Sequence, residues 1–246
     1  MESIRTKIEE NEVTKIAAEL EPKEAHDVLD WAVNRFPKLV LSSSFGLEDV
    51  VIIDILSKIK TDVKVVTLDT GRLPQETYDV MDAVREKYGL DIEVYFPDTT
   101  SVEKMVRDNG LNLFYKSVDF RKLCCGIRKV EPLRRALSGS DAWITGLRRD
   151  QVQSRTGINK VEWDADHGDI VKINPLADWN SEKVKGYVDA HQVPYNKLHD
   201  QGYPSLGCAP CTRAVKPEED PRAGRWWWEL DIDKECGIHS VAGKKD

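Results

Sequence analysis

The sequence predicts an α/β protein built around a mostly parallel sheet, and two observations carry this prediction. Short apolar runs typical of buried strands alternate with longer runs whose apolar residues recur at helical spacing, from residue 38 to residue 150. Ser, Gly, Asp and Pro residues follow the strand candidates, as is typical of turns that lead into helices. Strands that alternate with helices form βαβ units, so most neighbouring strands should run parallel.

The elements follow one another in a regular order. Residues 1–36 are expected to be helical, because apolar residues recur with a period near 3.6 from residue 24 onward and Pro37 ends that run. The strand candidates, each with its following turn, are residues 38–46, 63–71, 91–98 and 142–150. The helix candidates are residues 47–59, 73–89, 101–110 (capped by Thr100 or Ser101) and 120–139. Two short strands within residues 161–176, a helix at 181–192 and an irregular stretch after Tyr195 complete the chain.

The pattern divides the chain into three expected segments: an N-terminal helical segment at residues 1–36, an α/β domain at 37–215 and a C-terminal tail at 216–246. Ligands of open parallel sheets bind beyond the carboxyl ends of the strands. One rim of the sheet should therefore be lined by the loops that start at Ser42, Asp69, Pro97 and Gly146.

Composition and charge exclude several classes of function. The hydrophobic and charged fractions, 40% and 32%, are typical of a globular protein. The net charge of −7 disfavours non-specific binding of nucleic acid, although local basic clusters can still bind an anionic ligand. No apolar run is long enough to span a membrane, and the first ten residues resemble neither a signal peptide nor a transit peptide. We therefore expect a cytoplasmic protein whose thiols stay reduced.

Four of the five cysteines form two close pairs, Cys124 with Cys125 and Cys208 with Cys211. An odd number of cysteines argues against a closed disulfide framework. Four thiolates suit either a tetrahedral zinc ion or a [4Fe–4S] cluster. Adjacent cysteines are an awkward ligand pair for one small ion, which favours the cluster. Zinc, and unligated cysteines that pack as small apolar residues, remain the alternatives.

The fifth cysteine, Cys236, lies in a polar stretch near the C-terminus, between Lys234 and His239. Nearby cations lower the pKa of a thiol and so increase its thiolate fraction. Cys236 is therefore a candidate nucleophile, and a loosely held surface cysteine is the alternative. Arg222 and Arg225 lie just upstream and could accompany Cys236 into an anionic site, while the three tryptophans after Arg225 are expected to pack the tail onto the body of the protein.

Three loops carry groups suited to a nucleotide. Hydroxyl and backbone N–H groups at the start of a helix can cradle an anion, and these come from Ser42, Ser43, Ser44 and Gly46. A strand end that could meet a ribose, a base or a phosphate carries Asp69, Thr70 and Arg72. Guanidinium groups suited to phosphate or sulfate come from Arg148, Arg149 and Arg155. For each loop the alternative is a solvated charged surface.

These stretches together resemble the assimilatory adenylylsulfate (APS) and phosphoadenylylsulfate (PAPS) reductases. The resemblance rests on SSSFGLED, LDTGRLPQET, CCGIRKVEPL, TGLRRDQVQSR, GCAPCTR, GRWWWE and ECGIH, and it extends from about residue 38 to residue 239. It implies a Rossmann-like fold of the adenine-nucleotide alpha-hydrolase type, with a tail that carries the catalytic cysteine. Related ATP pyrophosphatases keep a Ser-Gly-Gly-x-Asp-Ser loop, whose absence here argues against ATP cleavage.

The resemblance also implies roles for individual residues. Cys236 matches the family's nucleophile. The basic residues that match its active site are Lys129, Arg222, Arg225 and His239. The ligands of a [4Fe–4S] cluster would be Cys124, Cys125, Cys208 and Cys211. Family members that reduce only PAPS commonly lack these four, so APS is the expected substrate, with PAPS or both nucleotides as the alternative.

The expected activity is the thioredoxin-dependent reduction of APS to sulfite and AMP, through an enzyme S-sulfocysteine, in sulfate assimilation. The expected partners are APS and thioredoxin, and the sequence leaves the oligomeric state open, a homo-oligomer included. Two other classes are weighed against it. One is an iron–sulfur or zinc protein that senses nucleotides without turnover. The other is an ATP-dependent thiolase that acts on tRNA, which the net charge and the missing loop disfavour.

Overall fold

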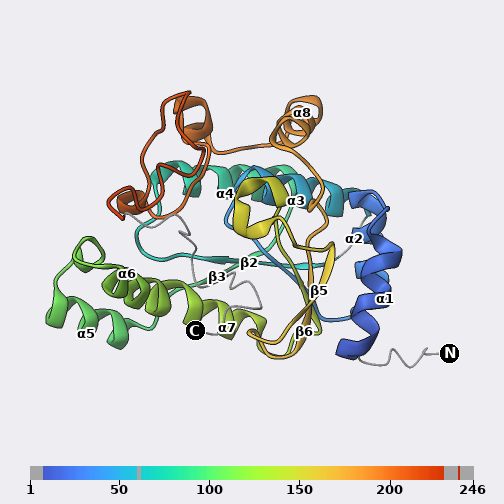
Figure 1. The fold of residues 1–246 in the computed structure, drawn as a ribbon, viewed down its shortest axis with the longest axis horizontal. Helices are drawn as coiled ribbons and strands as arrows, with labels where there is room; N and C mark the ends of the chain where they lie inside the picture. The colour runs from blue at the N-terminus through green and yellow to red at the C-terminus, as the bar shows by residue number, and fades with distance from the viewer. Residues whose placement is uncertain (1–7, 60–61, 230–237, 239–246) are drawn as a thin grey trace. The chain divides into compact units, whose positions relative to one another are not determined.

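The computed structural model describes residues 8–59, 62–229 and 238 (Figure 1). By its internal contacts the chain divides into two compact units. Unit 1 consists of residues 1–66, 80–93 and 137–195, as far as they are described. Unit 2 consists of residues 67–79, 94–136 and 196–246, with the same restriction. The predicted site residues are therefore distributed over two separately packed bodies.

Helices and strands alternate through most of the described chain (Figure 1). The α-helices are α1 (Glu10–Leu20), α2 (Ala25–Arg35), α3 (Leu47–Ile59), α4 (Gln75–Tyr88), α5 (Thr99–Asn109), α6 (Val118–Cys125), α7 (Glu131–Leu137) and α8 (Ser181–His191). The strands are β1 (Leu39–Ser42), β2 (Lys64–Leu68), β3 (Ile92–Tyr95), β4 (Ala142–Ile144), β5 (Val161–Asp164) and β6 (Ile170–Ile173). None of the described helices has the length and apolar character needed to cross a membrane.

The six strands form one sheet in the order β3-β2-β1-β4-β6-β5. β1 pairs in parallel with β2 and with β4, β4 pairs in parallel with β6, and only β5 is shown antiparallel, against β6. The predicted mostly parallel α/β fold is thus confirmed, as are the two short strands expected within residues 161–176. The strand order reverses between β1 and β4, which is where open α/β sheets place their ligand crevice.

Unit 1 is organised around α3, whose residues Val50–Leu56 are all buried. A helix that is apolar on nearly all sides must be covered on nearly all sides. α3 contacts both α2 and α8, and α1 contacts β5. The one charged residue within that stretch, Asp54, accepts hydrogen bonds from Tyr187 (2.7 Å) and Tyr88 (2.9 Å) and pairs with Lys58 (2.6 Å). These partners satisfy a carboxylate that would otherwise be costly to bury.

Two helix starts in unit 2 show how local sequence positions the site. α5 begins after Asp98, whose carboxylate accepts from the backbone N–H of Ser101 (2.8 Å) and from its hydroxyl (2.7 Å). The predicted cap at Thr100 or Ser101 is therefore wrong by two or three residues. α6 begins after Ser117, whose hydroxyl accepts from the N–H of Phe120 (3.2 Å). Side-chain oxygens at these positions satisfy N–H groups that have no partner within the helix.

The stretch predicted as a single helix over residues 120–139 is helical but not uniform. α6 ends at Cys125, a π-helical turn covers Gly126–Val130, and α7 follows directly. A π-turn widens the helix by one residue per turn and often occurs at functional sites. Here it comes immediately after the cysteine doublet.

Candidate functional site

Unit 2 brings the two cysteine pairs to one cavity. Cys124 and Cys125 end α6, while Cys208 and Cys211 bracket a short 3-10 turn that includes Pro210. All four are free thiols. The cavity is lined by these cysteines, by Phe114 and Pro210, and by four cationic side chains, Arg72, Arg121, Arg128 and Lys129. Two segments some 80 residues apart in the sequence thus contribute sulfur atoms to the same cationic pocket.

The loop after β2 connects the two cysteine-bearing segments. Thr70 places its Oγ1 3.2 Å from the Sγ of Cys208, and its carbonyl oxygen accepts from Nη1 of Arg128 at 2.6 Å. The carbonyl oxygen of Arg72 accepts from the backbone N–H of Ala209 at 2.8 Å. The loop expected to meet a ribose or a phosphate therefore contacts the cysteine cavity in this structure. The carboxylate of Asp69 accepts from the hydroxyl of Tyr78 at 3.0 Å.

Part of the C-terminal tail packs against the same cavity wall. Trp226 is 2% exposed, and its ring centroid lies 4.6 Å from Cζ of Arg121 and 4.9 Å from Cζ of Arg225. Its backbone N–H donates to the carbonyl oxygen of Cys211 at 3.3 Å. A Cβ atom at position 207 would meet the guanidinium of Arg225, so any larger residue there would have to displace that side chain. Tail, α6 and the Cys208–Cys211 loop are therefore closely packed together.

Burial raises the pKa of two thiols in the cavity. Loss of hydration raises the pKa of Cys124, and it raises the pKa of Cys211 to about 12, an effect that the nearby Cys208 increases and that Arg225 opposes. A buried thiol remains protonated unless a cation or metal compensates the thiolate charge. Cys124 and Cys211 are therefore poor free nucleophiles and are better suited to bind a positively charged group.

The donor chemistry fits an iron–sulfur cluster. Four thiols around one cavity are the ligand set of a [4Fe–4S] cluster, and the thiolate-bound cluster is anionic, so cationic surroundings stabilise it. Among the described residues, no group of three or more His, Cys, Asp or Glu side chains is arranged to hold a metal ion. The fit is therefore one of donor type and charge, which the four cysteines and the cations around them supply.

In unit 1 the loop after β1 is held by its own side chains. The backbone N–H and the hydroxyl of Ser44 both donate to Oδ2 of Asp49, at 2.6 and 2.8 Å. The hydroxyl of Ser43 accepts from the N–H of Phe45 at 3.1 Å. Phe45 is fully buried and has a φ of 58°, a value uncommon for residues other than glycine. The amide groups of Ser43, Ser44 and Phe45, in the predicted anion cradle, are thus bound by the protein itself.

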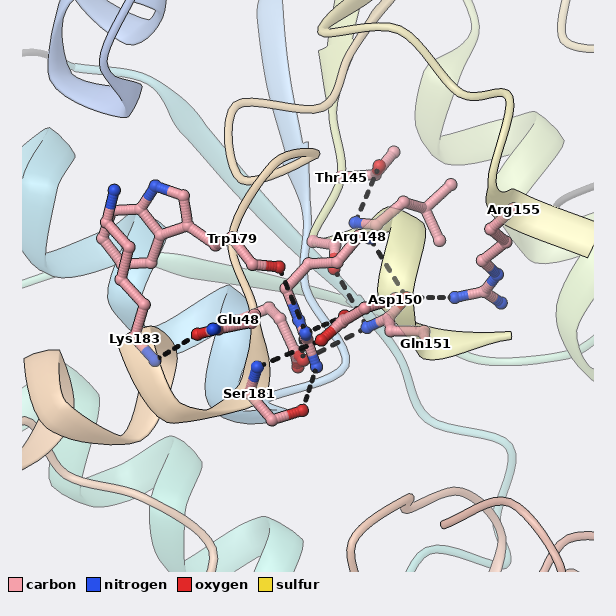
Figure 2. Close-up of polar contacts among 12 residues, drawn as sticks. Glu48, Thr145, Arg148, Asp150, Gln151, Arg155, Trp179, Ser181 and Lys183 are labelled. Carbon is pink, nitrogen blue, oxygen red and sulfur yellow. Dashed lines mark hydrogen bonds and ion pairs between the residues drawn. The ribbon is translucent and has the colours of Figure 1, made fainter. Parts of the chain in front are cut away.

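The loop after β4 forms a dense polar network with the start of α3 (Figure 2). Nε of Arg148 donates to Oε1 of Glu48 at 2.8 Å, and Nη2 donates to the hydroxyl of Ser181 at 3.2 Å. Gln151 also donates to Oε1 of Glu48, at 3.1 Å, and Arg148 pairs with Asp150. Arg148 is only 5% exposed. It therefore fixes this loop to α3 within unit 1.

The other two arginines of this loop also bind protein groups. Arg149 donates from Nη2 to Oε1 of Glu21 at 2.5 Å and from Nε to the carbonyl oxygen of Ile158 at 2.8 Å. Arg155 is buried and hydrogen-bonded to Oε1 of Gln151. The loops after β1 and β4, predicted to share one rim, do meet, but through residues of the protein rather than through open cationic groups.

Three residues of this junction, Glu48, Asp49 and Gln151, are not among the predicted site residues. Asp49 is buried against Gly146: a Cβ atom at position 146 would lie 2.5 Å from its Oδ1. Burial raises the pKa of Asp49 to about 6, a shift to which Glu48 adds and which Ser44 opposes. Acidic residues in the first turn of a helix commonly complement the helix dipole, so the sequence pattern offered no separate signal for this role.

The remaining predicted residues fall in three places. Ser42 ends β1 and Gly46 precedes α3, both in unit 1. Lys129 lies in the π-turn and lines the cysteine cavity, and Arg222 lies in a turn of the tail where its N–H donates to Asp220 at 2.7 Å. The predicted nucleophile Cys236 and the predicted His239 lie outside the described residues.

Comparisons with known proteins place the chain among reductases named for PAPS or for APS. Residues 38–214 match the phosphoadenosine phosphosulfate reductase domain. An adenosine 5'-phosphosulfate reductase of Allochromatium vinosum is 47% identical over 87% of this chain and 84% of its own, and one of Burkholderia cepacia is 46% identical over 92% and 89%.

Among solved structures, the phosphoadenylyl-sulfate reductase of Candida auris in a phosphate complex is 32% identical. It covers 85% of this chain and 99% of its own, with a TM-score of 0.73. An FMN adenylyltransferase of Candida glabrata, 14% identical with a TM-score of 0.55 over 95% of this chain and 80% of its own, shares the fold alone. The chain belongs to the phosphoadenosine phosphosulfate reductase family, as the resemblance of its motifs implied.

Proposed function

We propose that this protein reduces adenylylsulfate to sulfite and AMP, with thioredoxin as the electron donor, in the cytoplasmic assimilation of sulfate. The observation that carries the proposal is the identity of 46–48% to several relatives named adenosine 5'-phosphosulfate reductase, over 82–92% of this chain. The cysteine cavity supports it, because four thiols and four cations at one place suit an anionic reaction site with an iron–sulfur group beside it.

In the proposed reaction the thiolate of Cys236 attacks the sulfur atom of the sulfonate. The bond from that sulfur to the bridging phosphate oxygen breaks, AMP leaves, and an S-sulfocysteine forms. A thioredoxin thiolate then attacks Sγ of Cys236, sulfite leaves, and the second thioredoxin thiol resolves the mixed disulfide with release of Cys236. Two thiols thus supply both electrons. No further cysteine remains to resolve the adduct once four are assigned to the cavity, so an external dithiol is needed.

Cations are needed because an anionic thiolate approaches an anionic sulfonate. We assign this role to Lys129, Arg222, Arg225 and His239. Within the described residues Lys129 lines the cysteine cavity, and Arg225 packs on Trp226 at its wall. The four cavity cysteines would hold a [4Fe–4S] cluster. That cluster would order the segment from Cys124 to Lys129 and shape the local field.

PAPS is the second candidate substrate, favoured by the description of the matched family and by the Candida auris structure. The relatives named for APS are more similar to this chain, 46–48% against 32% identical, which favours APS.

The test is a turnover assay with reduced thioredoxin and either nucleotide, followed by intact-mass analysis without reductant. We expect sulfite from APS, faster than from PAPS, and a single sulfonate adduct on the wild-type protein. Cys236→Ser should bind AMP but form no adduct, because it lacks the nucleophilic thiolate. A sulfonate on the Cys236→Ser protein would contradict the assignment of the nucleophile. Nucleotide binding without any sulfite from the wild type would favour a sensor instead.

A further inference from the structure

Glu229, the last described residue before the gap at residues 230–237, forms a buried ion pair with Arg121 of α6. The guanidinium donates two parallel hydrogen bonds, Nε to Oε1 and Nη2 to Oε2, each 2.9 Å long. Arg121 is 4% exposed and Glu229 is 7% exposed. A two-point contact of this kind fixes both the distance and the orientation of its partners.

The same guanidinium also holds the turn that leads to Glu229. Its Cζ lies 4.6 Å from the ring of Trp226, and the backbone N–H of Glu229 donates to the carbonyl oxygen of Trp226 at 2.9 Å. Trp228, two residues further along, donates from Nε1 to the carbonyl oxygen of Phe114 at 3.2 Å. The turn from Trp226 to Glu229 is therefore attached to unit 2 through both side chains and backbone.

The two partners occupy informative positions in the sequence. Arg121 precedes Cys124 and Cys125 by three and four residues, so all three lie on neighbouring positions of one face of α6. Glu229 precedes Cys236 by seven residues, and a chain of that length spans about 25 Å at most. The pair thus ties the helix that carries the cysteine doublet to the point from which the chain proceeds to the fifth cysteine.

We propose that Arg121 and Glu229 are a positioning pair for the sulfonate transfer. By clamping the turn at Trp226–Glu229 onto α6, the pair fixes the point from which the chain continues to Cys236, and so supports the attack of its thiolate. The inference rests on the proposed function, since it takes Cys236 as the nucleophile. An ion pair serves such a role better than apolar packing. Burying two charges costs free energy, and only the arrangement in which the two groups form their hydrogen bonds offsets that cost.

The test compares Glu229→Gln, which keeps the shape of the side chain but removes its charge, with the matched control Glu219→Gln. Glu219 also forms a two-point pair, with Arg213, at 2.8 and 2.9 Å, but its pair closes a local, more exposed turn. Three quantities are measured: the single-turnover rate of adduct formation at saturating APS, the Kd for AMP, and hydrogen exchange of residues 226–229.

We expect Glu229→Gln to slow adduct formation about 10- to 100-fold, as small misplacements of a reacting group do, with the Kd for AMP unchanged. Hydrogen exchange at residues 226–229 should accelerate, and Glu219→Gln should change none of the three quantities. Arg121→Lys keeps the charge but loses the two parallel hydrogen bonds of the guanidinium. In a double-mutant cycle, the effects of Arg121→Lys and Glu229→Gln on the rate of adduct formation should not be additive.

A Glu229→Gln protein that binds AMP and forms the adduct at the wild-type rate would overturn the inference. If that variant does not bind AMP, Arg121→Lys is measured in its place, with the same expected and contradicting results. A wild-type protein that forms no adduct would instead contradict the proposed function. In that case the exchange measurement still tests whether the ion pair holds the turn in place. Unchanged exchange at residues 226–229 in Glu229→Gln would refute that role.

Discussion

Asp49 and Asp98 make the same two hydrogen bonds and yet have opposite pKa shifts. Each carboxylate accepts from the backbone N–H and the hydroxyl of one serine, Ser44 or Ser101. Asp98 is exposed, and its hydrogen bonds to Ser101 lower its pKa. Asp49 is buried, and loss of hydration outweighs the bonds from Ser44, so its pKa rises to about 6. Burial, rather than the local bonding pattern, decides the ionisation of a residue at the junction of two loops.

This contrast predicts opposite pH dependences for two conservative variants. A raised pKa means that folded Asp49 binds a proton more tightly than the unfolded chain does. The wild type should therefore lose stability relative to Asp49→Asn as the pH rises from 3.8 to about 6. The total loss is about 3 kcal/mol, and it persists above that range.

Asp98→Asn is the matched control, and its sign is reversed. Because the pKa of Asp98 is lowered, its contribution is present above the unfolded-state pKa of 3.8 and is lost as the pH falls. Urea unfolding of the three proteins, from well below pH 3.8 to above pH 6, measures both differences. A stability difference between wild type and Asp49→Asn that does not vary with pH would contradict the buried, proton-binding state of Asp49.

At the scale of elements, the loops after β1 and β4 are joined by close contact as well as by charge. They follow neighbouring strands at the point where the strand order reverses. Gly146 follows β4 by two residues and lies directly against the start of α3, where a Cβ atom would be 2.8 Å from Cβ of Glu48. The backbone of the loop after β4 thus fills the space beside the first turn of α3, and no side chain fits between them.

We therefore expect Gly146→Ala to destabilise the protein by about 1–3 kcal/mol, the usual cost of overpacking. Gly157→Ala in the same loop region is the control, because its Cβ would meet no atom within 4 Å. The control should change the free energy of unfolding by less than about 0.5 kcal/mol. Denaturant unfolding of both variants gives the comparison, and equal stabilities would show that the two loops separate more readily than their contact indicates.

At the scale of the whole molecule, the sheet and the cysteine pairs can be predicted from local sequence patterns. Contacts between residues far apart in the sequence cannot. The parallel sheet is predictable because strand and helix periods alternate, and the meeting of both cysteine pairs is predictable from their chemistry. The engagement of Arg148 with Glu48 is not, because the pairing of groups about 100 residues apart depends on strand order. Thr70 was expected at a nucleotide and lies beside Cys208, since a loop's contacts depend on which neighbour packs against it.

The division into two units predicts how the protein should respond if the proposed cluster is removed. Every cysteine of the cavity belongs to unit 2, and Cys124 and Cys211 form part of a buried core with Met105, Leu113, Phe114 and Trp226. A cluster bound there would link residue 125 to residue 208. In the chain-entropy account of cross-links, such a link raises the free energy of the unfolded chain by about 4.5 kcal/mol.

Oxidative removal of iron should therefore accelerate hydrogen exchange in unit 2 and leave the strands of unit 1 unchanged, because unit 1 has its own core around α3. The measurement is hydrogen exchange with mass spectrometry, alongside iron content and visible absorption. Cys208→Ser should reproduce the effect without oxidant, whereas Cys236→Ser, outside the proposed ligand set, should keep its iron and its protection. Equal acceleration in both units, or an iron-free protein with unchanged exchange in unit 2, would mean that the cysteines do not hold this unit together through a cluster.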